Sequence, residues 1–145
     1  MKIFRLKTHL LHQPNIGRDI DIASNASLYR LAKAILDAYG FDLDHAFGFF
    51  STVSSSNYFE AERKFELFTD LIEEGQDIEP TGAESVKKTR ASNVWRESGE
   101  QMLFLFDYGA SWLFVVTLDE IQERNPGKTY PRVVKKFGRA PKQYD

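Results

Sequence analysis

The chain has 145 residues, no cysteine and a formal net charge of -2 at neutral pH. This length suits one domain over residues 1–145, and the absence of cysteine excludes disulfides, thiolate nucleophiles and thiolate metal ligands. No apolar run approaches the roughly 18 residues that cross a membrane, and no haem or nucleotide motif is present. We therefore expect a soluble, cytoplasmic, single-domain protein that contacts no membrane and needs no cofactor.

Alternating apolar residues predict a strand over residues 2–12, and Ile16, Ile20 and Ile22 predict a second strand that pairs with it. Residues 24–27 offer N-cap side chains for a helix over residues 28–39, which Gly40 can end in a left-handed conformation. A further strand is predicted at 46–53. Another is predicted near 62–68, followed by a helical turn, with a mobile loop at 75–84 and a short helical turn near residue 91.

Residues 102–118 form the most apolar stretch and predict a β-hairpin with its break at residues 107–111. Gly109 can take a positive φ there, and the Asp107 and Ser111 side chains can bond nearby backbone. Both runs are apolar on both faces, so these strands should lie inside a sheet that is covered on both sides. A turn or short helix is predicted at 119–124, and an extended strap at 130–141.

Several short motifs follow one another in an order found in a known family. They are residues 3–7 (Ile-Phe-Arg-Leu-Lys), 14 and 16–18, 28–31, 41–45, 103–112 (Leu-Phe-Leu-Phe-Asp-Tyr-Gly-x-x-Trp) and 130–132 (Tyr-Pro-Arg). On these motifs the chain resembles the plasmid pRiA4b ORF-3-like proteins over essentially its whole length. The resemblance implies an α+β fold with a mostly antiparallel sheet. With the elements above, we expect about five to six strands and two or more helices packed on them.

The resemblance supplies no reaction, and its links to plasmids and an insertion element favour a regulatory or nucleic-acid role. Ala110 and Phe114 stand where relatives commonly have an acid and often a histidine, which removes most of a possible metal-binding set. Relatives also often differ at Gly17 and over residues 140–145, so a binding surface built from those ends is not carried over.

An acidic set could bind a divalent metal ion or act in acid–base chemistry. It comprises Asp42, Asp44 and His45, joined in space by Asp107. The alternative is that Asp42 and Asp44 cap a turn after the helix and His45 orients a loop.

Charge is unevenly distributed, because residues 1–18 and 124–142 contain no acid, whereas residues 59–84 are strongly acidic. The candidates for phosphate contact are Lys87, Lys88, Arg90, Arg132, Lys135, Lys136 and Arg139. Tyr130, Phe137 or Tyr144 could stack on bases. The alternative is a solvated basic face that offsets the acidic segment, since the net charge gives no long-range attraction to nucleic acid.

We favour a binding or regulatory module that is not an enzyme and that contacts a macromolecular partner, with nucleic acid as the first choice. A metal-dependent hydrolase that uses Asp42, Asp44, His45 and Asp107 is one alternative. A protein–protein interaction module is the other.

Overall fold

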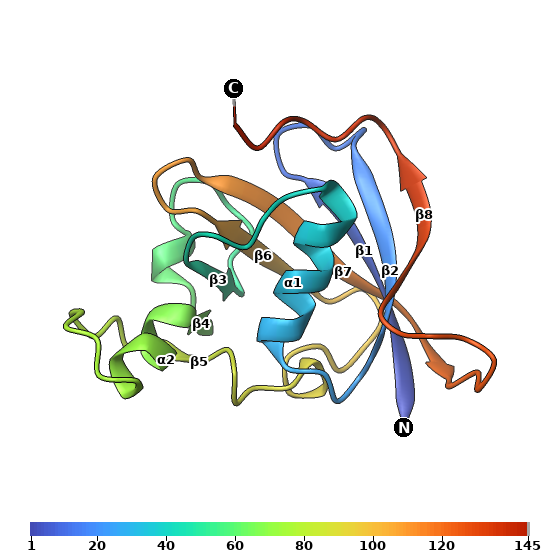
Figure 1. Cartoon of the computed structure of the whole chain (residues 1–145), viewed down its shortest axis with the longest axis horizontal. Coiled ribbons are helices and arrows are strands. Elements are labelled where there is room, and N and C mark those ends of the chain that lie inside the picture. The colour runs from blue at the N-terminus through green and yellow to red at the C-terminus, as the bar shows by residue number, and fades with distance from the viewer. Residues whose placement is uncertain (145) are drawn as a thin grey trace.

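A computed structural model describes residues 1–144, and one twisted sheet runs through it (Figure 1). Within those residues, eight strands lie in the order β5-β4-β3-β6-β7-β1-β2-β8. Their bounds are β1 Lys2–Leu10, β2 Gly17–Ala23, β3 Phe47–Phe50, β4 Lys64–Glu66, β5 Glu84–Ser85, β6 Gln101–Phe106, β7 Trp112–Glu123 and β8 Arg132–Phe137. Neighbouring strands are antiparallel except for β4 and β5, which are parallel. The helices are α1 (Leu28–Tyr39) and α2 (Leu67–Glu73), with short 3₁₀ turns η1 (Tyr58–Glu60) and η2 (Ala91–Asn93).

The predicted fold class was wrong about the sheet. The described residues are mostly sheet, with eight strands in one mixed sheet and two helices, and not five to six antiparallel strands. The predicted strap is β8, which pairs with β2, and β7 continues to Glu123 through the predicted turn or helix at 119–124. The parallel strand β5 has two residues and too little sequence for any periodic pattern, so only its neighbours define it.

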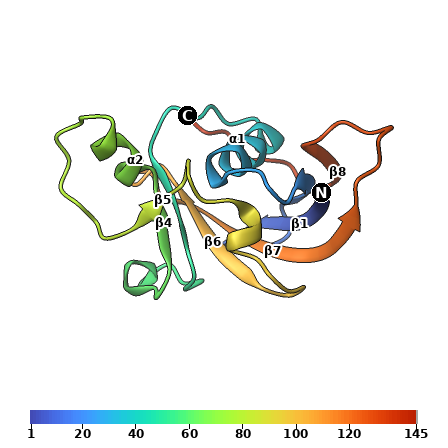
Figure 2. The ribbon, with the colours of Figure 1, turned by 90° about the horizontal axis from the view of Figure 1, so that it is seen from below.

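Helix α1 lies across one face of the sheet, as Figure 2 shows from below. Ser27 caps its first turn by accepting a hydrogen bond from the Arg30 N–H at 3.1 Å, and Gly40 ends it with a φ of 75°. The buried face packs on the strands, and the Tyr39 hydroxyl lies 2.9 Å from that of Thr8 on β1. The predicted helix is confirmed, because its caps and its apolar face are local features of the sequence.

The hairpin of β6 and β7 lies in the middle of the sheet, as predicted. Phe104 and Phe114 face the core under α1, whereas Leu105 and Leu113 face a second cluster that Phe50 and its neighbours cover. The loop differs from the prediction in one respect. Asp107 (φ 62°) and Ser111 (φ 56°) take the left-handed conformation that was expected of Gly109.

Interactions at both ends of the sheet hold the outer strands. Buried Arg18 donates to the Phe137 and Gly138 carbonyls at 2.9 and 3.1 Å, which ties the end of β8 to β2. At the other end, buried Asp70 of α2 accepts from the Ser85 hydroxyl at 2.5 Å and the Val86 N–H at 3.0 Å. Within residues 1–144, no helix has the length and apolar character that a membrane crossing needs.

Candidate nucleic-acid interface

Three segments that are distant in sequence meet around the first turn of α1. They enclose two adjoining hollows of about 550 and 500 Å³, which share Asn25, Ala26 and Arg30 in their walls. We call these two hollows together the basic groove. The residues that line them include several arginines and lysines but no aspartate or glutamate.

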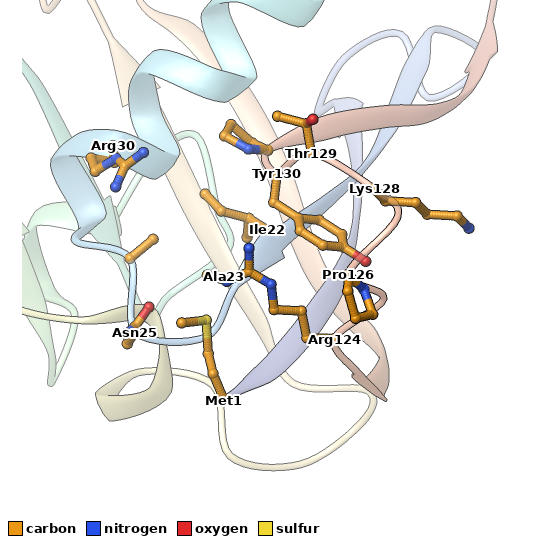
Figure 3. A pocket seen from close by; sticks show the side chains of 12 residues that line it. Met1, Ile22, Ala23, Asn25, Arg30, Arg124, Pro126, Lys128, Thr129 and Tyr130 are labelled. Carbon is orange, nitrogen blue, oxygen red and sulfur yellow. The ribbon is translucent and has the colours of Figure 1, made fainter.

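The larger hollow lies between the end of β2, the first turn of α1 and the loop that links β7 to β8. Figure 3 shows Arg30 on the helix side, with Arg124 and Tyr130 on the loop side. Lys128 lies at the outer edge of the same loop (Figure 3). This hollow therefore combines three cationic side chains with an aromatic ring.

The smaller hollow receives Lys87, Lys88 and Arg90 from the segment between β5 and η2. Backbone bonds hold that segment against α1, because the N–H groups of Leu28 and Tyr29 donate to the Thr89 and Val86 carbonyls at 2.9 and 3.1 Å. These bonds, with the Ser27 cap, occupy the first N–H groups of the helix. An anion in the groove would therefore meet side chains rather than the backbone of the helix end.

The cations of the groove differ in whether they already have partners. Lys87 pairs with Glu74 at 2.7 Å and Lys88 with Glu73 at 2.9 Å, and these hydrogen bonds raise the pKa of both lysines. Within residues 1–144, no ion pair involves Arg30, Arg90, Arg124 or Lys128. These four are thus the side chains whose charge is free for an anionic ligand.

Five of the seven predicted basic residues lie at or beside the groove. Lys87, Lys88 and Arg90 line it, whereas Arg132 and Lys136 line a third hollow of about 380 Å³ between α1 and β8, which adjoins it at Pro131. Lys135 and Arg139 line none of these three hollows. Lys135 instead lies opposite Asp19 in the pairing of β2 with β8.

The seven predicted basic residues do not include Arg30, Arg124 and Lys128, which line the groove. The acid-free run over residues 124–142 already contained a signal for Arg124 and Lys128. Arg30 had no such signal, because an exposed arginine on an amphipathic helix is ordinary. Its place in both hollows follows from the packing of three separate segments.

The acidic set is only partly brought together. The His45 Nε2 atom lies 3.5 Å from Asp107 Oδ2 and 3.7 Å from Asp44 Oδ1. Asp42 contributes backbone instead, since its N–H donates to Gln143 Oε1 at 2.8 Å and its carbonyl accepts from the Gln143 amide at 3.1 Å. Within residues 1–144, no three histidine, aspartate or glutamate side chains are grouped so that they could hold a metal ion.

Residues near the C-terminus bond to the side chains of Asp44 and His45. The Tyr144 hydroxyl donates to Asp44 Oδ2 at 2.6 Å and lies 2.9 Å from His45 Nε2, and Gln143 donates to Asp44 Oδ1 at 3.0 Å. The hydrogen bond from Tyr144 lowers the pKa of Asp44, and the same bond raises the pKa of Tyr144 to about 12. We call residues 42–45 with Asp107 the capped turn. Its side-chain bonds join Asp44 and His45 to the C-terminal segment instead of capping the turn, and its geometry gives the hydrolase alternative no support.

Comparison with known proteins gives a fold and a family. The crystal structure of the protein of unknown function MM3350 from Methanosarcina mazei Go1 is similar, with a TM-score of 0.72 and 24% sequence identity. The similarity covers 93% of this chain and 69% of that one, and it shows the fold. None of the curated proteins matches the sequence. The family model for plasmid pRiA4b ORF-3-like proteins matches residues 2–143, so the chain belongs to that family, as its motifs predicted.

Proposed function

We propose that this protein is a binding module that holds nucleic acid in the basic groove and catalyses no reaction. One observation carries the proposal. Arg30, Arg90, Arg124 and Lys128 come from three segments of the chain, yet they line two adjoining hollows that contain no acid. Side chains of this kind supply most contacts to phosphate, and phosphate contacts supply most of the affinity for nucleic acid.

The net charge of -2 does not oppose this proposal, because most acids lie away from the lining of the groove. Glu73 and Glu74 do reach its edge, where they pair with Lys88 and Lys87. The acidic segment 59–84 forms α2 and the strands and loops around it, at the opposite end of the sheet from β8 (Figure 1). At physiological salt, charges separated by more than about 8 Å are largely screened from one another. Since Glu73 and Glu74 offset Lys88 and Lys87, the positive charge that a ligand would meet in the groove comes from Arg30, Arg90, Arg124 and Lys128. Such a module would work in the cytoplasm.

The dependence of binding on salt tests the proposal. Four phosphate contacts give a slope of log affinity against log salt of about -2.8 to -3.6, so affinity should fall about 50- to 150-fold between 50 and 200 mM salt. Fluorescence anisotropy with a labelled 12-nucleotide DNA or RNA of mixed sequence measures this slope. Absence of binding at 50 mM salt, or an affinity that does not depend on salt, would refute the proposal.

A pair of matched variants locates the contact. Arg30→Ala should reduce the magnitude of the slope by about 0.7–0.9, the contribution of one phosphate. Arg96→Ala removes the same charge from another exposed arginine that lines neither hollow, so it should leave the slope unchanged. Equal effects of the two variants would place the contact outside the groove.

The alternative of a protein-interaction module stays a prediction. Light scattering on the purified chain checks it, because a stable dimer would be its signature. If the purified chain forms a stable dimer and does not bind nucleic acid, the result would favour that alternative over the proposal.

A further inference from the structure

We infer that the groove takes single-stranded nucleic acid and excludes duplex, with one base held against Tyr130. This inference rests on the proposed function and adds the class of strand that the groove selects. The inference follows from the apolar and aromatic residues that line the larger hollow, because contacts to phosphate need only the cationic residues.

The larger hollow is lined by apolar surface as well as by cations. Tyr130, Ile22, Pro126 and Pro131 share its walls with Arg30 and Arg124. A duplex presents phosphates on its outside and keeps the faces of its bases stacked within, so it offers such walls nothing to bury. A single strand exposes the faces of its bases, and proteins bind it by stacking aromatic rings on bases beside a cationic groove.

The elements around the groove do not protrude as a duplex reader would need. A protein reads a duplex by placing a helix or a two-stranded ribbon in the major groove. Here the apolar face of α1 packs against the sheet, and the backbone of its first turn is bonded to the segment from Val86 to Ala91. The surface between the end of β2, the first turn of α1 and the loop that links β7 to β8 is concave, and this larger hollow has a volume of about 550 Å³. That volume lies in the range of pockets that hold small ligands and is large enough for one nucleotide.

The loop that carries Tyr130 is held by its own hydrogen bonds. The Asn125 N–H donates to the Tyr130 hydroxyl at 3.3 Å, and the Gly127 N–H donates to Asn125 Oδ1 at 2.9 Å. These bonds hold the half-buried ring beside Arg124 at the edge of the hollow (Figure 3). A base at Tyr130 would place its flanking phosphates between Arg124 and Arg30. The next nucleotide would then enter the smaller hollow, towards Arg90.

Competition between strand forms is the first part of the test. A labelled 12-nucleotide single strand is displaced by unlabelled single strand or by a 12-base-pair duplex of the same sequence, at 50 mM salt. We expect the duplex to bind about 5- to 150-fold more weakly, because it loses the stacking contribution of one base. If neither form binds, the proposed function fails. If both bind equally, only this inference fails.

Variants of Tyr130 are the second part. Tyr130→Leu should weaken binding of the single strand about 5- to 150-fold without changing the salt slope. Tyr130→Phe keeps the ring and loses only the hydroxyl that accepts from Asn125, so it should retain most of the affinity that Tyr130→Leu loses. Tyr144→Leu is the matched control, since Tyr144 is exposed and lies outside both hollows. Photocrosslinking of a 5-iodouracil strand to the natural protein, mapped by mass spectrometry, requires no variant. A crosslink at Tyr130 supports the inference, and crosslinks confined to other aromatic residues overturn it.

Discussion

The basic groove and the capped turn are both assembled from polar side chains that are distant in sequence, yet they differ in whether those side chains already have partners. In the groove, Arg30, Arg124 and Lys128 line a hollow without an ion pair among residues 1–144. In the capped turn, Gln143 and Tyr144 occupy the carboxylate of Asp44. Clustering alone therefore does not make a binding site, because a ligand must compete with every internal partner.

Removal of the unpaired cations should have the largest effect on binding. The variant Arg30→Ala/Arg124→Ala/Lys128→Ala should bind a 12-nucleotide single strand about 100- to 500-fold more weakly at 100 mM salt, since each phosphate contact contributes about 0.7–0.9 in log affinity per decade of salt. Anisotropy titration measures the loss. All three side chains are exposed, so the urea midpoint should not change. A triple variant that binds like the natural protein would remove the distinction between the two regions.

Substitutions in the capped turn should lower the free energy of unfolding and leave the binding of nucleic acid unchanged. Asp107 Oδ1 accepts from the Gly109 and Ala110 N–H groups at 3.1 and 3.2 Å, and its backbone has a φ of 62°. Asp107→Ala loses both bonds and places alanine in a left-handed conformation, so it should cost about 2 kcal/mol in urea unfolding. Asp107→Asn should cost less, because asparagine tolerates that conformation and keeps an acceptor oxygen. Loss of oligonucleotide binding in a folded Asp107→Ala protein would contradict a purely structural role.

The contact with Tyr144 should be visible in the titration of Asp44. A lowered pKa means that this contact contributes stability above the ordinary pKa of the carboxyl and loses it as pH falls through the lowered value. The pKa of Tyr144 is raised to about 12. The stability that this hydroxyl contributes is therefore fully present below the ordinary pKa of tyrosine and is lost as pH rises through about 12. The contact should therefore hold at neutral pH. Tyr144→Phe should move the pKa of Asp44 back up in a carbon-13 NMR titration, whereas Tyr130→Phe should not.

The smallest expected effect is that of a divalent metal ion on the capped turn. Because Asp42 contributes only backbone and Tyr144 holds Asp44, Mn²⁺ at micromolar concentrations should not selectively broaden the NMR signals of His45. Histidines 9 and 12 are internal controls for nonspecific broadening. Selective broadening at His45 and Asp107 would make the turn a metal site after all and reverse the comparison.

Local features of the sequence predicted some elements correctly. The helix over residues 28–39 carries its own cap in Ser27 and its own stop in Gly40, and the hairpin around Asp107 carries its own turn. Local features could not predict the number and order of strands in the sheet. Strand β5 exists because Asp70 holds Ser85 and Val86 beside α2, and β8 is a strand because β2 offers it an open edge. Both depend on partners far away in the chain.

The sequence by itself determined the family, the central hairpin and the presence of basic segments without acids. Only the tertiary structure decided which charges remain unpaired and which of them share a hollow. Arg30 lines the groove because the bonds from Leu28 and Tyr29 bring residues 86–89 to its helix. The pairing of β2 with β8 likewise brings the loop of Arg124 and Tyr130 back to the start of α1. Charge is a property of each residue, but its availability depends on contacts that form only when the chain folds.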